Sequence, residues 1–128
     1  IVVCTDTFAY CFGMLFGKSS RGIVKASPNK SLVGFIGGIL SSIAIGILMK
    51  VIFPEIFVGN YFKIVILGFF TAISGIVGDL IESVFKRSCN IKDSGTLIPG
   101  RGGVLDSIDS LLIAAPIFYI IVQFLYLN

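Results

Sequence analysis

The sequence has no histidine and no tryptophan, and only 13% of its 128 residues are charged. Soluble globular domains carry about a quarter charged residues, so this composition argues against a soluble fold. The three cysteines are odd in number and form no Cys-x-x-Cys pair, which argues against a disulfide framework. Because histidine is absent, a zinc site would need all three thiolates from distant positions, and zinc chemistry is therefore not expected.

Long apolar stretches are what the sequence does have. Hydrophobic residues make up 55% of the chain, and its mean hydropathy is +1.01. Four apolar blocks come close to the roughly 20 residues that a helix needs to cross a bilayer; they are 1–17, 31–53, 61–82 and 104–127. Three polar segments separate them, at 18–30, 54–60 and 83–103. The sequence therefore predicts an all-α, polytopic integral membrane helix bundle with about four spans in this chain.

Basic residues are shared unevenly among the polar segments. The first and third segments, with their edges, carry eight of the ten Lys and Arg residues. Because two predicted spans separate these segments, both are expected on the same side of the membrane. The positive-inside rule makes that side cytoplasmic and places the C-terminus outside. We expect the protein in a cell inner or plasma membrane. For Arg21 and Lys25, orientation of the chain explains the charge as well as binding does.

Carboxylates occur within the predicted spans, where each is costly unless it is paired or hydrated. They are Asp6, Asp79, Glu82, Asp106 and Asp109. Asp79 and Glu82 are spaced i,i+3, and so are Asp106 and Asp109, so each pair shares one helix face. The first pair ends one span and the second begins the next, which brings both pairs to the same membrane surface. Four carboxylates there suit a hard divalent cation such as Mg²⁺.

Structural roles remain open for three of these acids. Asp106 or Asp109 could cap the last helix, because a carboxylate near a helix start accepts from free backbone N–H groups. Glu82 could instead pair with Lys86 at i+4.

Glycines have two different settings. Within the spans, spacings such as Gly75-x-x-Gly78 are expected to let helices approach closely. Gly102 and Gly103 instead lie in a polar segment just before a helix start, where backbone N–H groups can hold an anion. Ordinary turns use the same residues, so this second pattern is weak by itself.

The polar segment before the last span carries a long pattern of mixed residue types. It reads Ser83-x-x-Lys86-Arg87, then after four residues Lys92-Asp93-x-Gly95, then Pro99-x-x-Gly102-Gly103-x-x-Asp106-x-x-Asp109. This pattern resembles the signature of the phosphatidate cytidylyltransferases (CDP-diacylglycerol synthases). Two upstream stretches are also similar to that family: Asp6-Thr7-x-Ala9-Tyr10-x-x-Gly13-x-x-Phe16-Gly17 and Ser27-Pro28-x-Lys30-Ser31-x-x-Gly34-x-x-Gly37-Gly38. The resemblance corresponds to the family's C-terminal half, so we expect residues 1–128 to form the C-terminal catalytic half of a membrane cytidylyltransferase.

The resemblance implies a Mg²⁺-dependent nucleotidyl transfer in phospholipid biosynthesis. CTP and phosphatidate would give CDP-diacylglycerol and pyrophosphate at an active site that faces the cytoplasm. Reactions of this kind are catalysed mainly by positioning and by neutralising negative charge. The bilayer lipids are the other expected partners, and nucleic acid is not an expected partner. A second, monovalent cation in the site and a homodimer both remain open.

The resemblance also implies roles for individual residues. Asp79 and Asp106 would bind the metal, and Asp109 would be a further ligand or a partner of the ligands. Lys86 and Lys92 would hold the triphosphate or the lipid phosphate and complete the catalytic set. The substrate-binding positions carried over from the family motifs are Asp6, Ser27, Lys30, Arg87, Asp93, Arg101, Gly102 and Gly103.

The chain departs from the family pattern at three positions. Arg101 stands where the family usually has His, Ser107 where it usually has Arg, and Val33 where it usually has an acid. Two other classes stay open beside the synthase. A CTP-dependent lipid or polyprenol kinase would use similar acids, and a non-enzymatic membrane transporter fragment would place its acids near the middle of the bilayer.

Overall fold

The fold is a bundle of four helices. The computed structural model describes residues 1–17, 30–91, 94–95 and 103–126. Along the chain the helices are α1 (Val2–Phe16), α2 (Leu32–Ile52), α3 (Tyr61–Ser88) and α4 (Leu105–Tyr126). All regular elements in the described part of the chain are helices, which confirms the predicted all-α class.

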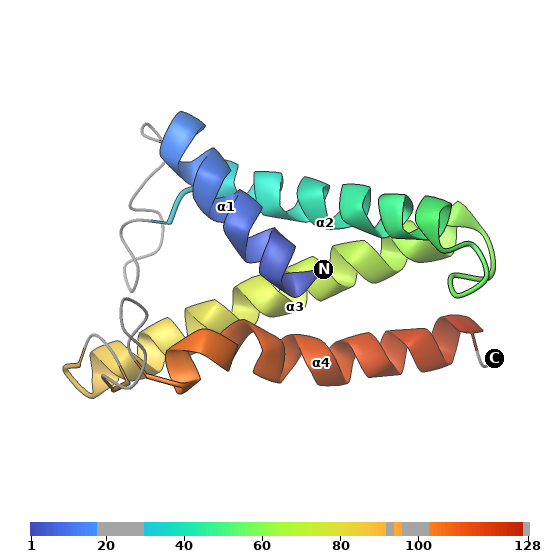
Figure 1. Cartoon of the computed structure of the whole chain (residues 1–128). Helices are drawn as coiled ribbons and strands as arrows, with labels where there is room; N and C mark the ends of the chain where they lie inside the picture. Colours follow the sequence, from blue (N-terminus) through green and yellow to red (C-terminus); the bar gives the residue numbers. More distant parts are fainter. Residues whose placement is uncertain (18–29, 92–93, 96–102, 127–128) are drawn as a thin grey trace.

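The helices α2, α3 and α4 run alternately up and down, and α1 packs mainly on α2 (Figure 1). One end of the bundle holds the end of α1, the start of α2, the end of α3 and the start of α4. We call it the loop end, and the opposite end the far end. The helix ends that flank the predicted polar segments 18–30 and 83–103 thus lie together, as the charge pattern predicts.

Three helices are long and apolar enough to cross a membrane: Leu32–Ile52, Tyr61–Ser88 and Ile108–Tyr126. The fourth, α1, is apolar but has 15 residues, which span about 22 Å of the roughly 30 Å hydrocarbon core. Large apolar side chains cover the outside of the bundle, and Phe124 for example is 71% exposed. This surface suits lipid contact, so the structure agrees with a polytopic membrane bundle.

The third helix is longer than the sequence predicted. The predicted span stops at residue 82, whereas α3 continues to Ser88. It ends in a Schellman motif, in which Asn90 adopts a positive φ of 56° and the Ile91 N–H donates to the Lys86 carbonyl at 3.0 Å. Lys86 and Arg87 lie in the last turn, where basic side chains favour the negative end of the helix dipole. The helix therefore continues past the predicted span through the mixed polar and apolar residues 83–88.

Glycine and serine bring the helices close together. A Cβ added to Gly34 would lie 2.7 Å from the Ala9 carbonyl oxygen of α1. The buried Ser42 Oγ of α2 donates to the Gly68 carbonyl of α3 at 2.9 Å. Small residues and interhelical hydrogen bonds are the usual means of helix association in membranes. Apolar side chains alone do not drive this association, because lipid tails surround them as favourably as another helix does.

Two lysines contact aromatic rings at the far end of the bundle. Lys50 Nζ lies 4.7 Å from the centre of the Tyr61 ring, and Lys63 Nζ lies 5.1 Å from that of Tyr126. Lys63 also donates to the Leu125 carbonyl in the last turn of α4. Tyrosine and lysine in this arrangement are typical of a membrane–water interface.

Candidate active site

Three carboxylates converge at the loop end. Asp79 and Glu82 of α3 and Asp109 of α4 each offer an oxygen within 4.8 Å of the others. We call these residues the carboxylate cluster. The helices meet closely at this point, because a Cβ added to Gly78 would lie 2.8 Å from the Asp109 carbonyl oxygen. Glycine next to Asp79 therefore allows α4 to approach α3 closely enough to complete the cluster.

Glu82 is the least exposed member of the cluster. The residue is 7% exposed, and among the described residues neither of its carboxylate oxygens accepts a hydrogen bond. Lys86 Nζ does lie 3.0 Å from Glu82 Oε2, as an ion pair without hydrogen-bond alignment. A buried carboxylate with so few partners is costly. Oxygen donors grouped in this way fit a hard divalent cation such as Mg²⁺.

Asp106 lies beside the cluster and has partners of its own. Its Oδ1 accepts from Lys86 Nζ at 2.8 Å, and its Oδ2 accepts from the backbone N–H groups of Ser94 at 2.9 Å and Gly103 at 2.7 Å. Asp106 precedes the candidate span Ile108–Tyr126. Burial opposes ionisation of its carboxyl, but the Lys86 ammonium and these N–H groups outweigh burial and hold the pKa of Asp106 below its usual range.

Lys86 joins Asp106 to the cluster. Its ammonium lies between Glu82 and Asp106, and both carboxylate side chains are less than a tenth exposed. The i+4 pairing that the sequence suggested for Glu82 is therefore present, and it coexists with membership of the cluster. The hydrogen bond from Gly103 to the first turn of α4 likewise supports the structural role considered for Asp106. Its predicted role as a metal ligand stays a prediction.

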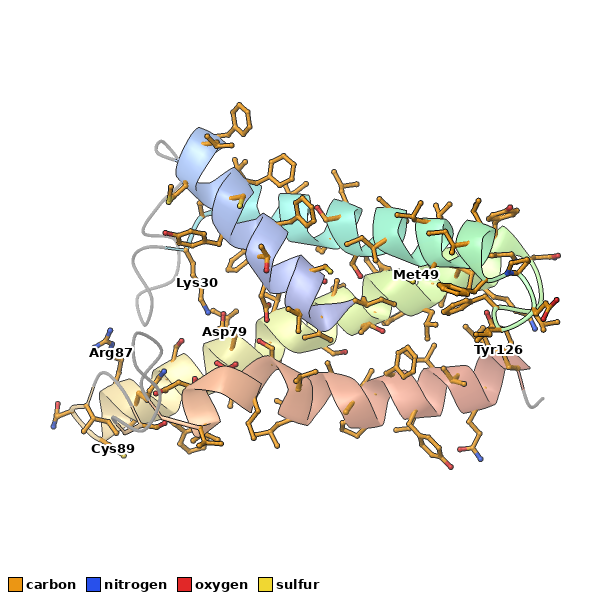
Figure 2. The ribbon with its side chains drawn as sticks, viewed as in Figure 1. Lys30, Met49, Asp79, Arg87, Cys89 and Tyr126 are labelled. Atoms are coloured by element: carbon orange, nitrogen blue, oxygen red, sulfur yellow. The ribbon has the colours of Figure 1, made fainter. Side chains whose placement is uncertain are left out.

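A cavity of about 510 Å³ lies between α1, α2 and α3 next to the cluster. Polar side chains line part of its wall, namely Asp6, Lys30, Ser31 and Asp79. Apolar or aromatic side chains line the rest, among them Ala9, Tyr10, Met14, Phe35 and Ile76. Figure 2 shows the Lys30 side chain reaching from the start of α2 towards Asp79 of α3, with which it forms an ion pair. Asp79 thus belongs to both the cavity and the carboxylate cluster.

The predicted site residues fall into four sets, three within the described part of the chain and one outside it. Asp6, Lys30 and Asp79 line the cavity, and Lys86, Asp106 and Gly103 are joined by hydrogen bonds beside Asp109. Arg87 lies in the last turn of α3 near the end of the helix (Figure 2). The predicted residues that lie outside the described part of the chain are Ser27, Lys92, Asp93, Arg101 and Gly102.

Two contributors were not among the predicted site residues. The i,i+3 spacing to Asp79 indicated that Glu82 shares its helix face. Pairing of Glu82 with Lys86 at i+4 was a simpler explanation of the same residue. The Ser94 contact uses a backbone N–H group, and no motif or spacing in the sequence indicated Ser94.

Comparison with known proteins gives one consistent family. The model of the cytidylyltransferase family matches residues 1–125. A phosphatidate cytidylyltransferase of Staphylococcus haemolyticus is 42% identical over 121 residues, which are 94% of this chain and 45% of the relative. One from Chlamydia muridarum is 42% identical over 120 residues, 91% of this chain and 39% of the relative. The chloroplastic phosphatidate cytidylyltransferase 4 of Arabidopsis thaliana is 39% identical over 120 residues, 92% of this chain and 29% of the relative. The chain spans less than half the length of these curated relatives.

Proposed function

This chain belongs to the cytidylyltransferase family, as its sequence motifs predicted, and we propose that it supplies the catalytic half of an enzyme that makes CDP-diacylglycerol from CTP and phosphatidate. The observation that carries the proposal is the carboxylate cluster at the edge of a cavity that both polar and apolar side chains line. Such a cavity suits a substrate with a charged headgroup and apolar chains, and its volume of about 510 Å³ is within the usual range for ligand sites.

The proposed reaction transfers the cytidylyl group. A phosphate oxygen of phosphatidate attacks the α-phosphorus of CTP, the bond from that phosphorus to the bridging oxygen breaks, and pyrophosphate leaves. Asp79, Glu82 and Asp109 are proposed to hold Mg²⁺, which when bound would neutralise charge on the phosphate oxygens. Lys86 fixes the positions of Glu82 and Asp106 through its ion pairs.

Basic side chains are proposed to receive the phosphate groups. Lys30 lines the cavity beside Asp79. Lys92 and Arg101, outside the described residues, are further candidates on the strength of the sequence pattern alone. Lysine binds phosphate as a point charge and arginine as a bidentate donor, so together they can orient a triphosphate and a lipid phosphate for in-line attack.

The proposed orientation places the loop end at the cytoplasmic surface of a cell inner or plasma membrane. Its support is the concentration of basic residues in the two polar segments that adjoin this end. The site is near one surface, since Asp106 and Asp109 occupy the first two turns of α4. A transporter would favour acids near the middle of the spans, so the enzyme is the better explanation.

Labelled CTP distinguishes the synthase from a kinase. The full-length protein in nanodiscs that contain phosphatidate would receive CTP labelled at the α- or the γ-phosphate, with Mg²⁺ varied. We expect α-label in the lipid fraction and γ-label in released pyrophosphate. Transfer of γ-label to lipid would instead establish a kinase, and no transfer of either label would overturn the proposal.

Two variants connect this activity to the site. Glu82→Gln keeps the shape of a cluster member but removes its charge, so it should raise the Mg²⁺ concentration that gives half-maximal activity. Lys50→Met, at the far end of the bundle, is the matched control and should leave that concentration unchanged. Equal Mg²⁺ dependence in both variants would refute the role of the cluster.

A further inference from the structure

We propose that Lys30 neutralises Asp79 before a divalent cation binds and leaves Asp79 when the cation binds there. Lys30 then binds the phosphate of an incoming substrate. This inference deepens the proposed function and rests on it, because it concerns the same site. It assigns to one lysine the task of making substrate binding depend on prior metal binding.

The geometry places Lys30 between the two parts of the site. Its ammonium forms an ion pair with Oδ2 of Asp79, which is also a member of the carboxylate cluster. The Lys30 side chain is 19% exposed and that of Asp79 35% exposed, so the pair is partly shielded from water. Lys30 also lines the cavity of about 510 Å³. A small movement of one ammonium can therefore transfer a positive charge from the cluster to the cavity.

The backbone beside Lys30 is held firmly while its side chain can turn. Ser31 is the N-cap of α2, and its Oγ accepts from the Gly34 N–H at 3.1 Å. Gly34 in turn lies against the Ala9 carbonyl of α1, which fixes the start of α2 on its neighbour. Lysine has a long stem of rotatable bonds and a compact charge, so Lys30 can change partner without movement of the adjoining α2.

The two lysines at the cluster differ in how they are held. Lys86 lies between two carboxylates with little exposure, Glu82 at 3.0 Å and Asp106 at 2.8 Å. Lys30 has a single carboxylate within ion-pair distance in the described part of the chain, and that carboxylate is the most exposed of those that form ion pairs. A cation that binds Asp79 repels both ammonium groups, and Lys30 has fewer partners to lose. Lys30 is therefore the group that moves.

Chemical labelling of the lysine tests the movement directly in the unmodified protein. An amine-reactive reagent would be applied to the full-length protein in nanodiscs, with mass spectrometry measuring the labelling rate of Lys30. We expect Mn²⁺ to raise this rate several-fold, because the ammonium loses Asp79 as its partner. CTP, or phosphatidate in the nanodisc, should lower it again in the presence of Mn²⁺, and the two arms identify which phosphate Lys30 binds. Diacylglycerol, which lacks the phosphate, is the control lipid.

Metal affinity gives a second readout that does not depend on turnover. Lys30→Met removes the competing charge, so the apparent Kd for Mn²⁺, measured by electron paramagnetic resonance without nucleotide, should fall by about three- to tenfold. Lys30→Arg keeps the charge and should stay within about twofold of the parent protein. Lys50→Met at the far end should leave Mn²⁺ binding unchanged.

The outcomes separate this inference from the proposed function. If Mn²⁺ leaves the labelling of Lys30 unchanged, or if Lys30→Met binds Mn²⁺ no more tightly, the inference is wrong even when the protein transfers α-label to lipid. If Lys30 is released by Mn²⁺ but neither CTP nor phosphatidate protects it, the substrate-binding half is wrong. Failure of the proposed function appears instead as absence of lipid labelling in the unmodified protein.

Discussion

Replacing Gly78 with alanine should separate α3 from α4 and disturb the carboxylate cluster. The added Cβ would lie 2.8 Å from the Asp109 carbonyl oxygen and 3.2 Å from the Ser110 Cα, so the helices must move apart by several tenths of an ångström. Both contacts are with backbone or Cα atoms of α4, which cannot turn aside as a flexible side chain can. Overpacking of this kind costs about 1–3 kcal/mol.

Gly75, one turn earlier on the same helix, provides a matched control. A Cβ there would meet a Val2 side-chain atom at 3.5 Å and the Ser110 Cβ at 3.8 Å, which are ordinary contacts. Both substitutions gain the same helix propensity of up to about 1 kcal/mol. The propensity gain therefore cancels between the two variants, and the difference between them isolates the close approach at Gly78.

The measurement is the free energy of unfolding in mixed detergent–SDS micelles, combined with CDP-diacylglycerol formation by the full-length protein. Gly78→Ala should be less stable than Gly75→Ala by about 1–3 kcal/mol. It should also lose roughly 10- to 100-fold in activity, because Asp109 shifts relative to Asp79. If the two variants are equally stable and equally active, the close approach of α3 and α4 does not position the cluster.

Three further substitutions test the polar contacts of the bundle. Lys86→Met leaves Glu82 and Asp106 without their shared ammonium, so the free energy of unfolding in mixed micelles should fall by about 3–5 kcal/mol; a loss below about 1 kcal/mol would contradict the shared pairing. Asp106→Asn removes the charge that Lys86 meets, and turnover of labelled CTP should fall by about three orders of magnitude while circular dichroism shows a folded helix bundle; near-normal turnover would refute a catalytic role. Ser42→Ala removes the buried hydrogen bond to Gly68 and should lower the free energy of unfolding in the same micelles by about 0.6–1.7 kcal/mol. An unchanged free energy of unfolding would mean that this hydrogen bond does not stabilise the bundle.

The helices and the convergence of acids could be predicted from the sequence because both depend on local spacing. Apolar blocks located three of the helices to within a residue or two at each end, and the i,i+3 spacing placed Asp79 and Glu82 on one face of α3. The end of α3 was missed because the predicted span followed the apolar block, whereas the helix continues through residues 83–88 to the Schellman motif at Asn90.

Partners that come together only through the tertiary fold were beyond the sequence. Lys30 precedes α2 and Asp79 lies in α3, and nothing in their spacing indicates an ion pair. The different contacts of the acids also depend on the tertiary fold. Asp106 accepts from Lys86 and from backbone N–H groups, whereas the cluster consists of Asp79, Glu82 and Asp109. Identical residue types in a family motif can thus have different partners.

The bonds that Asp106 accepts from Ser94 and Gly103 have a consequence for how this protein can vary. One carboxylate oxygen holds together the two ends of the intervening segment 95–102. For a segment closed in this way, doubling its length would add only about 0.6 kcal/mol of closure entropy. Insertions there should therefore be tolerated by the fold far better than a change at Asp106 itself.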